Sequence, residues 1–183
     1  MQLRPLATLA ALALLLPTAG ASPTAEGSGV AAASRAEDPK PAERDTSHFN
    51  LGKAGLALEG YDPVAYFPEG GGKARKGDAK FSATHKGVTY HFASDENRQA
   101  FLKDSAKFEP QYGGWCAYAI PGKEKVEVDP ESFVVREGKL YLFYKGFFND
   151  TRSKWQKDPA DFVKRGDTAW KEITAKPLPE KKK

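Results

Sequence analysis

Two stretches of strand-forming residues, each divided by a short glycine-containing turn, constrain the fold of this chain most strongly. The first spans residues 79–92, with apolar and polar residues alternating on both sides of Lys86-Gly87, and the second spans residues 132–144 and turns at Glu137-Gly138. Both patterns are typical of a β-hairpin. The return arm over residues 140–144 has no polar face, so we expect it to be central in a sheet.

Helix signals follow the first hairpin. Ser94 is a good N-cap, and the acidic residues after it suit the positive end of a helix dipole. We therefore predict a helix over residues 95–103, with Phe101 and Leu102 facing inward.

Two further helix signals follow the second hairpin. Asn149 or Asp150 can cap a helix that runs through Gln156, and Asp158-Pro159 places proline at the first position of another. Gly166 is a possible interruption of that last helix. The order of strands, helix, strands and helices predicts an α+β fold: a single compact domain with a small antiparallel sheet of hairpins packed with a few helices.

The N-terminal residues have the features of a secretory signal peptide. Arg4 is positively charged, residues 6–16 are apolar, and residues 19–21 form a small-residue cleavage site. The apolar run is shorter than the roughly 20 residues of a membrane-spanning helix. We predict cleavage near Ala21, export to the periplasm or the extracellular space, and no transmembrane segment.

Composition divides the rest of the chain into three parts. Residues 22–46 have the Ala, Ser, Pro, Gly and charged composition of a flexible linker, and residues 176–183 that of a basic, disordered tail. Residues 47–175 are long enough for one domain with its own core. The net charge of +4 lies largely in the three terminal lysines, so we expect no nucleic-acid partner.

The only cysteine, Cys116, lies in an unusual stretch over residues 110–120. It follows Gly113-Gly114 and is surrounded by aromatic residues, among them Tyr112 and Trp115. Glycine permits backbone shapes that other residues avoid, and aromatic rings need apolar surface, so a packed turn is expected. A single cysteine cannot form an internal disulfide. Cys116 is therefore a buried inert thiol, an intermolecular partner or a working thiol.

Three motifs together resemble the YHS-domain family, and in particular its secreted bacterial branch. They are residues 61–67 (Tyr-Asp-Pro-Val-Ala-Tyr-Phe), residues 87–101 and residues 112–119 (Tyr-Gly-Gly-Trp-Cys-Ala-Tyr-Ala). The family's Tyr, His and Ser correspond to Tyr90, His91 and Ser94. The other motif positions that we expect to be structural are Tyr61, Asp62, Pro63, Tyr112, Gly113, Gly114 and Trp115.

The resemblance implies an association with metals, but this chain departs from the pattern that would carry it. Metal-binding members have cysteines where Ala65, Ala93 and Asn97 stand here. Thiolate clusters are what Cu(I) and Zn(II) require, so a metal finger is not expected. The secreted branch keeps its cysteine at the position of Cys116, in some members as selenocysteine, which implies a chemical role.

His91, Cys116 and Asp62 are the residues that could still form a sparse site for a copper or zinc ion. Each also has a structural interpretation. His91 could be an ordinary histidine on a sheet face, and Asp62, which precedes a proline, could bond backbone amides in its own turn. We expect His48 to be solvated at the edge of the linker and His85 to be a polar residue at the hairpin turn.

Three functions remain open. The first is a module that binds a metal or a small ligand near Cys116 and His91. The second is a redox protein in which Cys116 reacts with an outside thiol or a protein partner. The third is a structural or interaction domain with an inert thiol. The sequence contains no catalytic triad, phosphate-binding loop or Cys-x-x-Cys pair, so a conventional enzyme is not expected.

Overall fold

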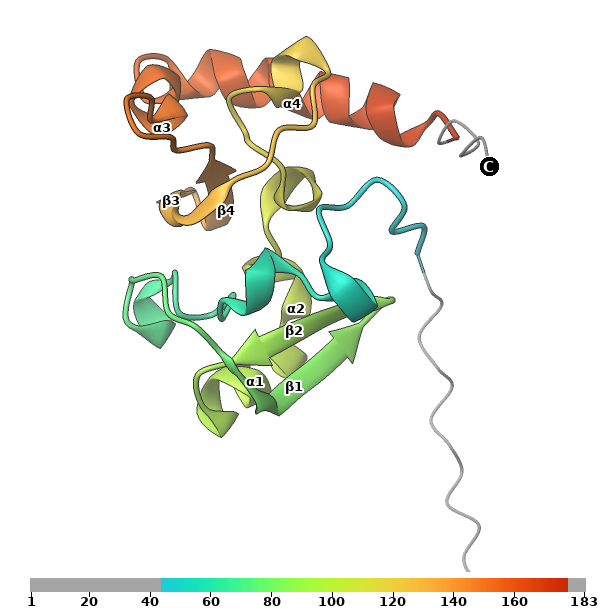
Figure 1. Cartoon of the computed structure of the whole chain (residues 1–183), viewed down its shortest axis with the longest axis vertical. Helices are drawn as coiled ribbons and strands as arrows, with labels where there is room; N and C mark the ends of the chain where they lie inside the picture. Colours follow the sequence, from blue (N-terminus) through green and yellow to red (C-terminus); the bar gives the residue numbers. More distant parts are fainter. Residues whose placement is uncertain (1–43, 178–183) are drawn as a thin grey trace, which may run out of the picture. The chain divides into compact units, whose positions relative to one another are not determined.

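The computed structural model describes residues 44–177, which all fall within one compact unit (Figure 1). The predicted signal peptide, most of the predicted linker and most of the tail lie outside the described residues. The fold is α+β, as expected: four α-helices accompany two antiparallel two-stranded sheets. None of the helices within residues 44–177 is long and apolar enough to cross a lipid bilayer.

The first hairpin has the register that the alternating pattern predicts. Strand β1 (Asp78–His85) pairs with β2 (Val88–Phe92), and His85 lies opposite Val88. Both turn residues, Lys86 and Gly87, have positive φ angles. The two faces of β2 also differ in burial as expected. Val88, Tyr90 and Phe92 on one face are buried, whereas Thr89 and His91 on the other are only half-buried.

The second hairpin shows that the prediction of a central strand over residues 140–144 was wrong, because its sheet has only two strands among the described residues. Strand β3 (Asp129–Arg136) pairs with β4 (Lys139–Phe143), which has β3 as its one strand partner in the sheet. Leu140 and Leu142 of β4 enter one apolar cluster, and Tyr141 and Phe143 enter another. Strand β4 is therefore buried because it lies between two cores. Its second edge forms isolated parallel bridges with Pro110 and Cys116 rather than with a third strand.

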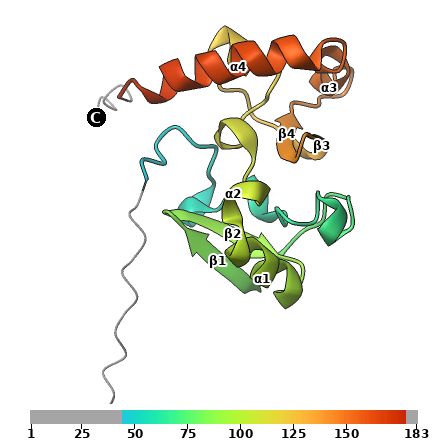
Figure 2. The same cartoon turned by 180° about the vertical axis from the view of Figure 1, so that it is seen from behind.

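The two cores lie on opposite faces of β4. The first contains apolar side chains from β1, β2 and the two short helices α1 (Asp95–Lys103) and α2 (Ser105–Phe108). The second contains side chains from α3 (Thr151–Trp155), α4 (Pro159–Thr174) and the cysteine stretch. Figure 2 shows β3 and β4 between α4 and the first hairpin.

Helix α1 has the predicted bounds, and Ser94 caps it by accepting a hydrogen bond from the Asn97 amide at 3.3 Å. Phe101 is fully buried, but the prediction for Leu102 was wrong, since its side chain is 48% exposed. Neighbouring residues on a helix point in different directions, so the two side chains could not share one narrow apolar face.

Helices α3 and α4 begin at the predicted caps, Asp150 and Asp158. Gly166 does not interrupt α4 but lies buried within it. A Cβ atom at Gly166 would lie only 2.7 Å from the hydroxyl oxygen of Tyr112. Glycine is therefore placed here to make room for the Tyr112 ring.

Candidate functional site

The cysteine stretch forms the packed glycine turn that the sequence predicts. A 3₁₀ turn over Gln111–Gly114 has positive φ angles at Tyr112, Gly113 and Gly114. Beyond the turn, the backbone N–H of Cys116 donates to Val126 at 3.0 Å. The stretch is held along the edge of β4 by the backbone N–H of Ala117, which donates to Leu142 at 2.9 Å, where Cys116 forms its bridge.

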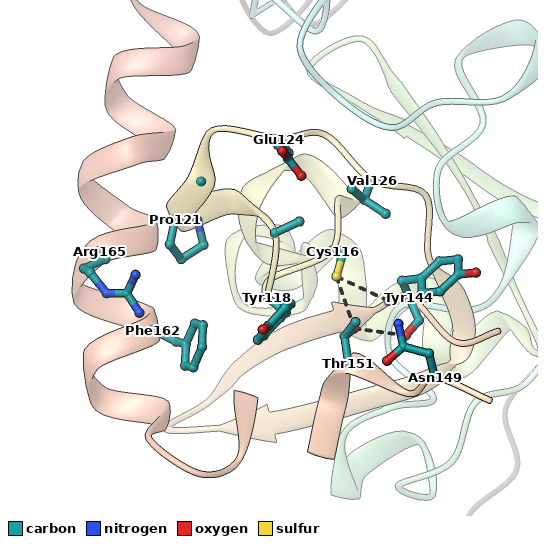
Figure 3. A pocket seen from close by; sticks show the side chains of 12 residues that line it. Cys116, Tyr118, Pro121, Glu124, Val126, Tyr144, Asn149, Thr151, Phe162 and Arg165 are labelled. Atoms are coloured by element: carbon teal, nitrogen blue, oxygen red, sulfur yellow. Dashed lines mark hydrogen bonds between the residues drawn. The ribbon is translucent and has the colours of Figure 1, made fainter. Parts of the chain in front are cut away.

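The sulfur of Cys116 is buried and hydrogen-bonded. The residue is 0% exposed, the backbone N–H of Tyr144 donates to Sγ at 3.3 Å, and the hydroxyl oxygen of Thr151 lies 3.4 Å from Sγ (Figure 3). The Thr151 hydroxyl donates its one proton to the carbonyl of Tyr144 at 2.9 Å. The S–H group must then donate to Thr151, and this arrangement satisfies the neutral thiol.

A cavity of about 530 Å³ lies beside this thiol. It is lined by Cys116 and Thr151, by apolar groups of the loop that follows the cysteine, and by Phe162 and Arg165 of α4 (Figure 3). The rings of Tyr118 and Phe162 are 5.1 Å apart and form an aromatic wall. The volume is within the range of cavities that bind small molecules.

Two cations flank the aromatic wall. The Arg165 guanidinium lies 5.0 Å from the centre of the Phe162 ring and bonds Asp161, and the Lys154 ammonium lies 5.8 Å from the Tyr118 ring. Glu124, Asn149 and Thr151 add polar groups to the lining. The cavity thus combines flat apolar surface with a few polar groups of both signs.

Asp62 has a structural role. Its buried carboxylate accepts hydrogen bonds from the amides of Val64 (2.8 Å), Ala65 (3.3 Å) and Ala93 (2.8 Å) and from the side chain of Asn97 (2.6 Å). The expectation that Asp62 bonds backbone in its turn is confirmed. Ala65, Ala93 and Asn97 are thus gathered around one carboxylate through hydrogen bonds.

The structure does not bring His91, Cys116 and Asp62 together into a metal site. No group of three or more His, Cys, Asp or Glu side chains within residues 44–177 could hold a metal ion. His91 lies on the outward face of β2, Asp62 is enclosed by N–H donors, and Cys116 lies beside β4 and α3. Each candidate residue therefore has its own separate environment.

The remaining motif residues also have separate roles. The Tyr90 hydroxyl donates to Glu109 at 2.8 Å. Burial of the hydroxyl is the larger cause that raises the pKa of Tyr90, and the negative charge of Glu109 is the second. Arg44 pairs with the other oxygen of Glu109 at 2.8 Å, so this part of the predicted linker contacts the domain. Tyr61 donates to Glu131 at 3.3 Å.

The prediction that His48 is solvated was wrong. Its side chain is 5% exposed, and Nε2 lies 2.7 Å from the carbonyl oxygen of Lys176, to which it donates. The indole N–H of Trp115 donates to the His48 carbonyl at 2.6 Å, so the cysteine stretch fixes this residue. His85 is half-buried with its ring edge-on to Phe101, and burial lowers the pKa of its imidazole.

Several residues of the cavity were not predicted as site residues, namely Tyr144, Asn149, Thr151, Phe162 and Arg165. They follow Cys116 by many positions and belong to no local motif. The sequence predicted a helix that begins at Asp158-Pro159, but a predicted helix alone does not distinguish a cavity wall from a core.

The chain matches no protein-family model, no curated protein and no solved structure in the three comparisons made.

Proposed function

We propose that this protein is a binding module for a small organic ligand, held in the cavity beside Cys116. The observation that carries the proposal is the combination of a cavity of about 530 Å³ with an aromatic wall and a small number of polar groups. Apolar linings with a few polar groups are characteristic of small-molecule sites. The sequence predicted a module that binds either a metal or a small ligand. We propose the second of these, a small ligand.

The lining suggests the chemistry of the ligand. A flat or branched apolar group would pack against Tyr118 and Phe162, while Arg165 would attract an acidic group. Asn149 offers an amide that can donate or accept hydrogen bonds. Glu124 is also in the lining and disfavours a polyanion. We therefore propose a ligand with one apolar part and a single carboxylate-like group.

The environment of Cys116 gives less support to a redox function. A reactive cysteine needs access and a stabilised thiolate. Here the residue is 0% exposed, and the S–H group has an acceptor in Thr151. In the proposed function, Cys116 shapes the base of the cavity and does not act as a nucleophile.

A protein-observed NMR screen of isotope-labelled protein against small aromatic and aliphatic carboxylates would test the proposal, with matched amides as the uncharged comparison. We expect weak binders among the carboxylates, with chemical-shift changes at Tyr118, Phe162 and Arg165. Thiol titration with each binder present would distinguish binding from chemistry, since binding alone leaves Cys116 unmodified. If no carboxylate binds, or if all shift changes lie away from the cavity, the proposal fails.

A further inference from the structure

Two phenylalanines form the tip of the loop between β4 and α3. Phe147 and Phe148 are each 94% exposed, far more than the other exposed large apolar residues, Leu102 at 48% and Tyr144 at 38%. Their rings contact each other edge to face, with centres 4.5 Å apart. Single exposed apolar residues are ordinary, but an adjacent pair of fully exposed aromatic rings marks an interaction site.

Backbone hydrogen bonds across the loop hold the two phenylalanines in place. The N–H of Gly146 donates to Asn149 at 2.8 Å, and Lys145 forms an antiparallel bridge with Asp150. The two phenylalanines therefore occupy the central positions of a tight turn, where Gly, Asn and Asp are the usual residues. The Tyr144 ring lies against Gly146, since a Cβ there would be 2.5 Å from the tyrosine oxygen.

The surroundings of the tip are cationic. Residues 144–157 contain the four cations Lys145, Arg152, Lys154 and Lys157 and the single carboxylate Asp150. Lys145 lies 3.9 Å from Asp129, and Arg152 lies 3.1 Å from Asp150. Among the described residues, no carboxylate lies within ion-pair distance of Lys154 or Lys157. Two positive charges that follow the tip in the sequence, Lys154 within α3 and Lys157 just after it, thus remain available to an external anion.

We propose that the Phe147–Phe148 turn inserts into the surface of an anionic lipid bilayer. Aromatic side chains favour the boundary between headgroups and acyl chains, and lysines beside them attract anionic headgroups. Apolar groups buried at the boundary between headgroups and acyl chains can hold a protein on a membrane surface without crossing it. This inference rests on Phe147 and Phe148, which do not line the cavity, although Asn149 of the same turn does line it and Lys154 also flanks the aromatic wall.

Vesicle flotation tests the proposal with the full-length chain. Vesicles of equal parts phosphatidylglycerol and phosphatidylcholine are compared with vesicles of phosphatidylcholine alone. We expect binding to the anionic vesicles that weakens with salt, and we expect the double substitution F147S/F148S to reduce it at least about tenfold. Leu102→Ser is the matched control at an exposed apolar position in another part of the fold, and it should bind as the wild type does.

A reporter at the tip separates its insertion from any binding by residues 6–16. The variants Phe148→Trp and Leu102→Trp are mixed with anionic vesicles that contain brominated phosphatidylcholine. We expect stronger fluorescence quenching for Phe148→Trp, because bromine quenches only indoles that lie among the acyl chains.

Three results would overturn the proposal. The first is the absence of binding to anionic vesicles, and the second is equal quenching of the two tryptophan variants. The third is a self-associated state in sedimentation that F147S/F148S abolishes while vesicle binding is unchanged, since the tip would then be a contact between copies of the protein.

Discussion

The hydroxyl oxygen of Thr151 lies 3.4 Å from the sulfur of Cys116 while its proton is donated to the carbonyl of Tyr144. The hydroxyl is thus an acceptor for the S–H group, and the backbone N–H of Tyr144 supplies a donor to the same sulfur. The thiol is integrated into the junction between β4 and α3 as a hydrogen-bonded neutral group. This junction also forms the base of the cavity.

Replacement of Cys116 by alanine should destabilise the fold. The substitution removes the partner of the Tyr144 N–H and leaves a small void, so we expect the free energy of unfolding to fall by about 1–3 kcal/mol. Urea denaturation measures this change, with exposed Ser153→Ala as the control. In the native wild type, a thiol reagent should label Cys116 only after unfolding. Rapid labelling under native conditions would contradict the buried, inert thiol.

The carboxylate of Asp62 joins the turn over residues 61–67 to the junction between β2 and α1. Replacement by alanine leaves four N–H donors without this acceptor, and we expect a loss of at least about 3 kcal/mol. Asp78→Ala at an exposed position should change stability by less than about 0.5 kcal/mol.

Chelation distinguishes this structural role of Asp62 from metal binding. Because N–H donors surround both carboxylate oxygens, EDTA should leave the melting temperature unchanged. An Asp62→Ala variant as stable as the wild type would contradict the structural role of this carboxylate. A melting temperature that depends on added zinc would instead indicate metal binding.

The buried hydroxyl of Tyr90 should make the protein less stable in alkali. Burial raises the pKa of Tyr90 above its value of about 10 in the unfolded chain, so the folded state keeps a proton that the unfolded state loses. The resulting contribution is fully present below about pH 10 and declines above it, by up to about 1.4 kcal/mol per pH unit.

Urea titrations at about pH 9 and about pH 11 should show this decline, and Tyr90→Phe should make it shallower. Burial also raises the pKa of Tyr141, to about 12, so part of the decline should persist in the variant. An identical decline in wild type and variant would contradict the assignment to Tyr90.

Gly166 provides a test of packing against helix propensity. Alanine is the better helix former by about 1 kcal/mol, but its Cβ would lie 2.7 Å from the hydroxyl oxygen of Tyr112. We expect Gly166→Ala to lower stability because that hydroxyl also donates to Asp167 at 3.0 Å and is not free to move. Exposed Thr168→Ala on the same helix should be neutral or slightly stabilising. A more stable Gly166→Ala variant would show that Tyr112 can shift.

Local signals in the sequence predicted the elements of the fold well. Alternation located the first hairpin and strand-forming residues around Glu137-Gly138 located the second, and Ser94, Asp150 and Asp158 cap the helices that were expected to follow them. These features depend on neighbouring residues. The burial of His48 could not be predicted, because it depends on the carbonyl of Lys176 at the other end of the domain.

The cavity was less predictable than the fold because no single segment forms it. Cys116 was singled out from the sequence and lies in the cavity lining, but Thr151, Phe162 and Arg165 reach the cavity only through the packing of α3 and α4. Asp62 was only partly predictable. Its hydrogen bonds to backbone amides of its own turn were expected from the sequence, while its contacts with Ala93 and Asn97 depend on the fold.

The affinity of a carboxylate ligand for matched variants tests the proposed function most directly. Calorimetry with the tightest carboxylate from the screen would compare wild type with Phe162→Ala, Arg165→Gln and the exposed control Lys164→Gln. We expect the first two variants to bind about tenfold or more weakly, through lost apolar contact and lost charge, and Lys164→Gln to bind like the wild type. Equal affinity in all four proteins would contradict the account.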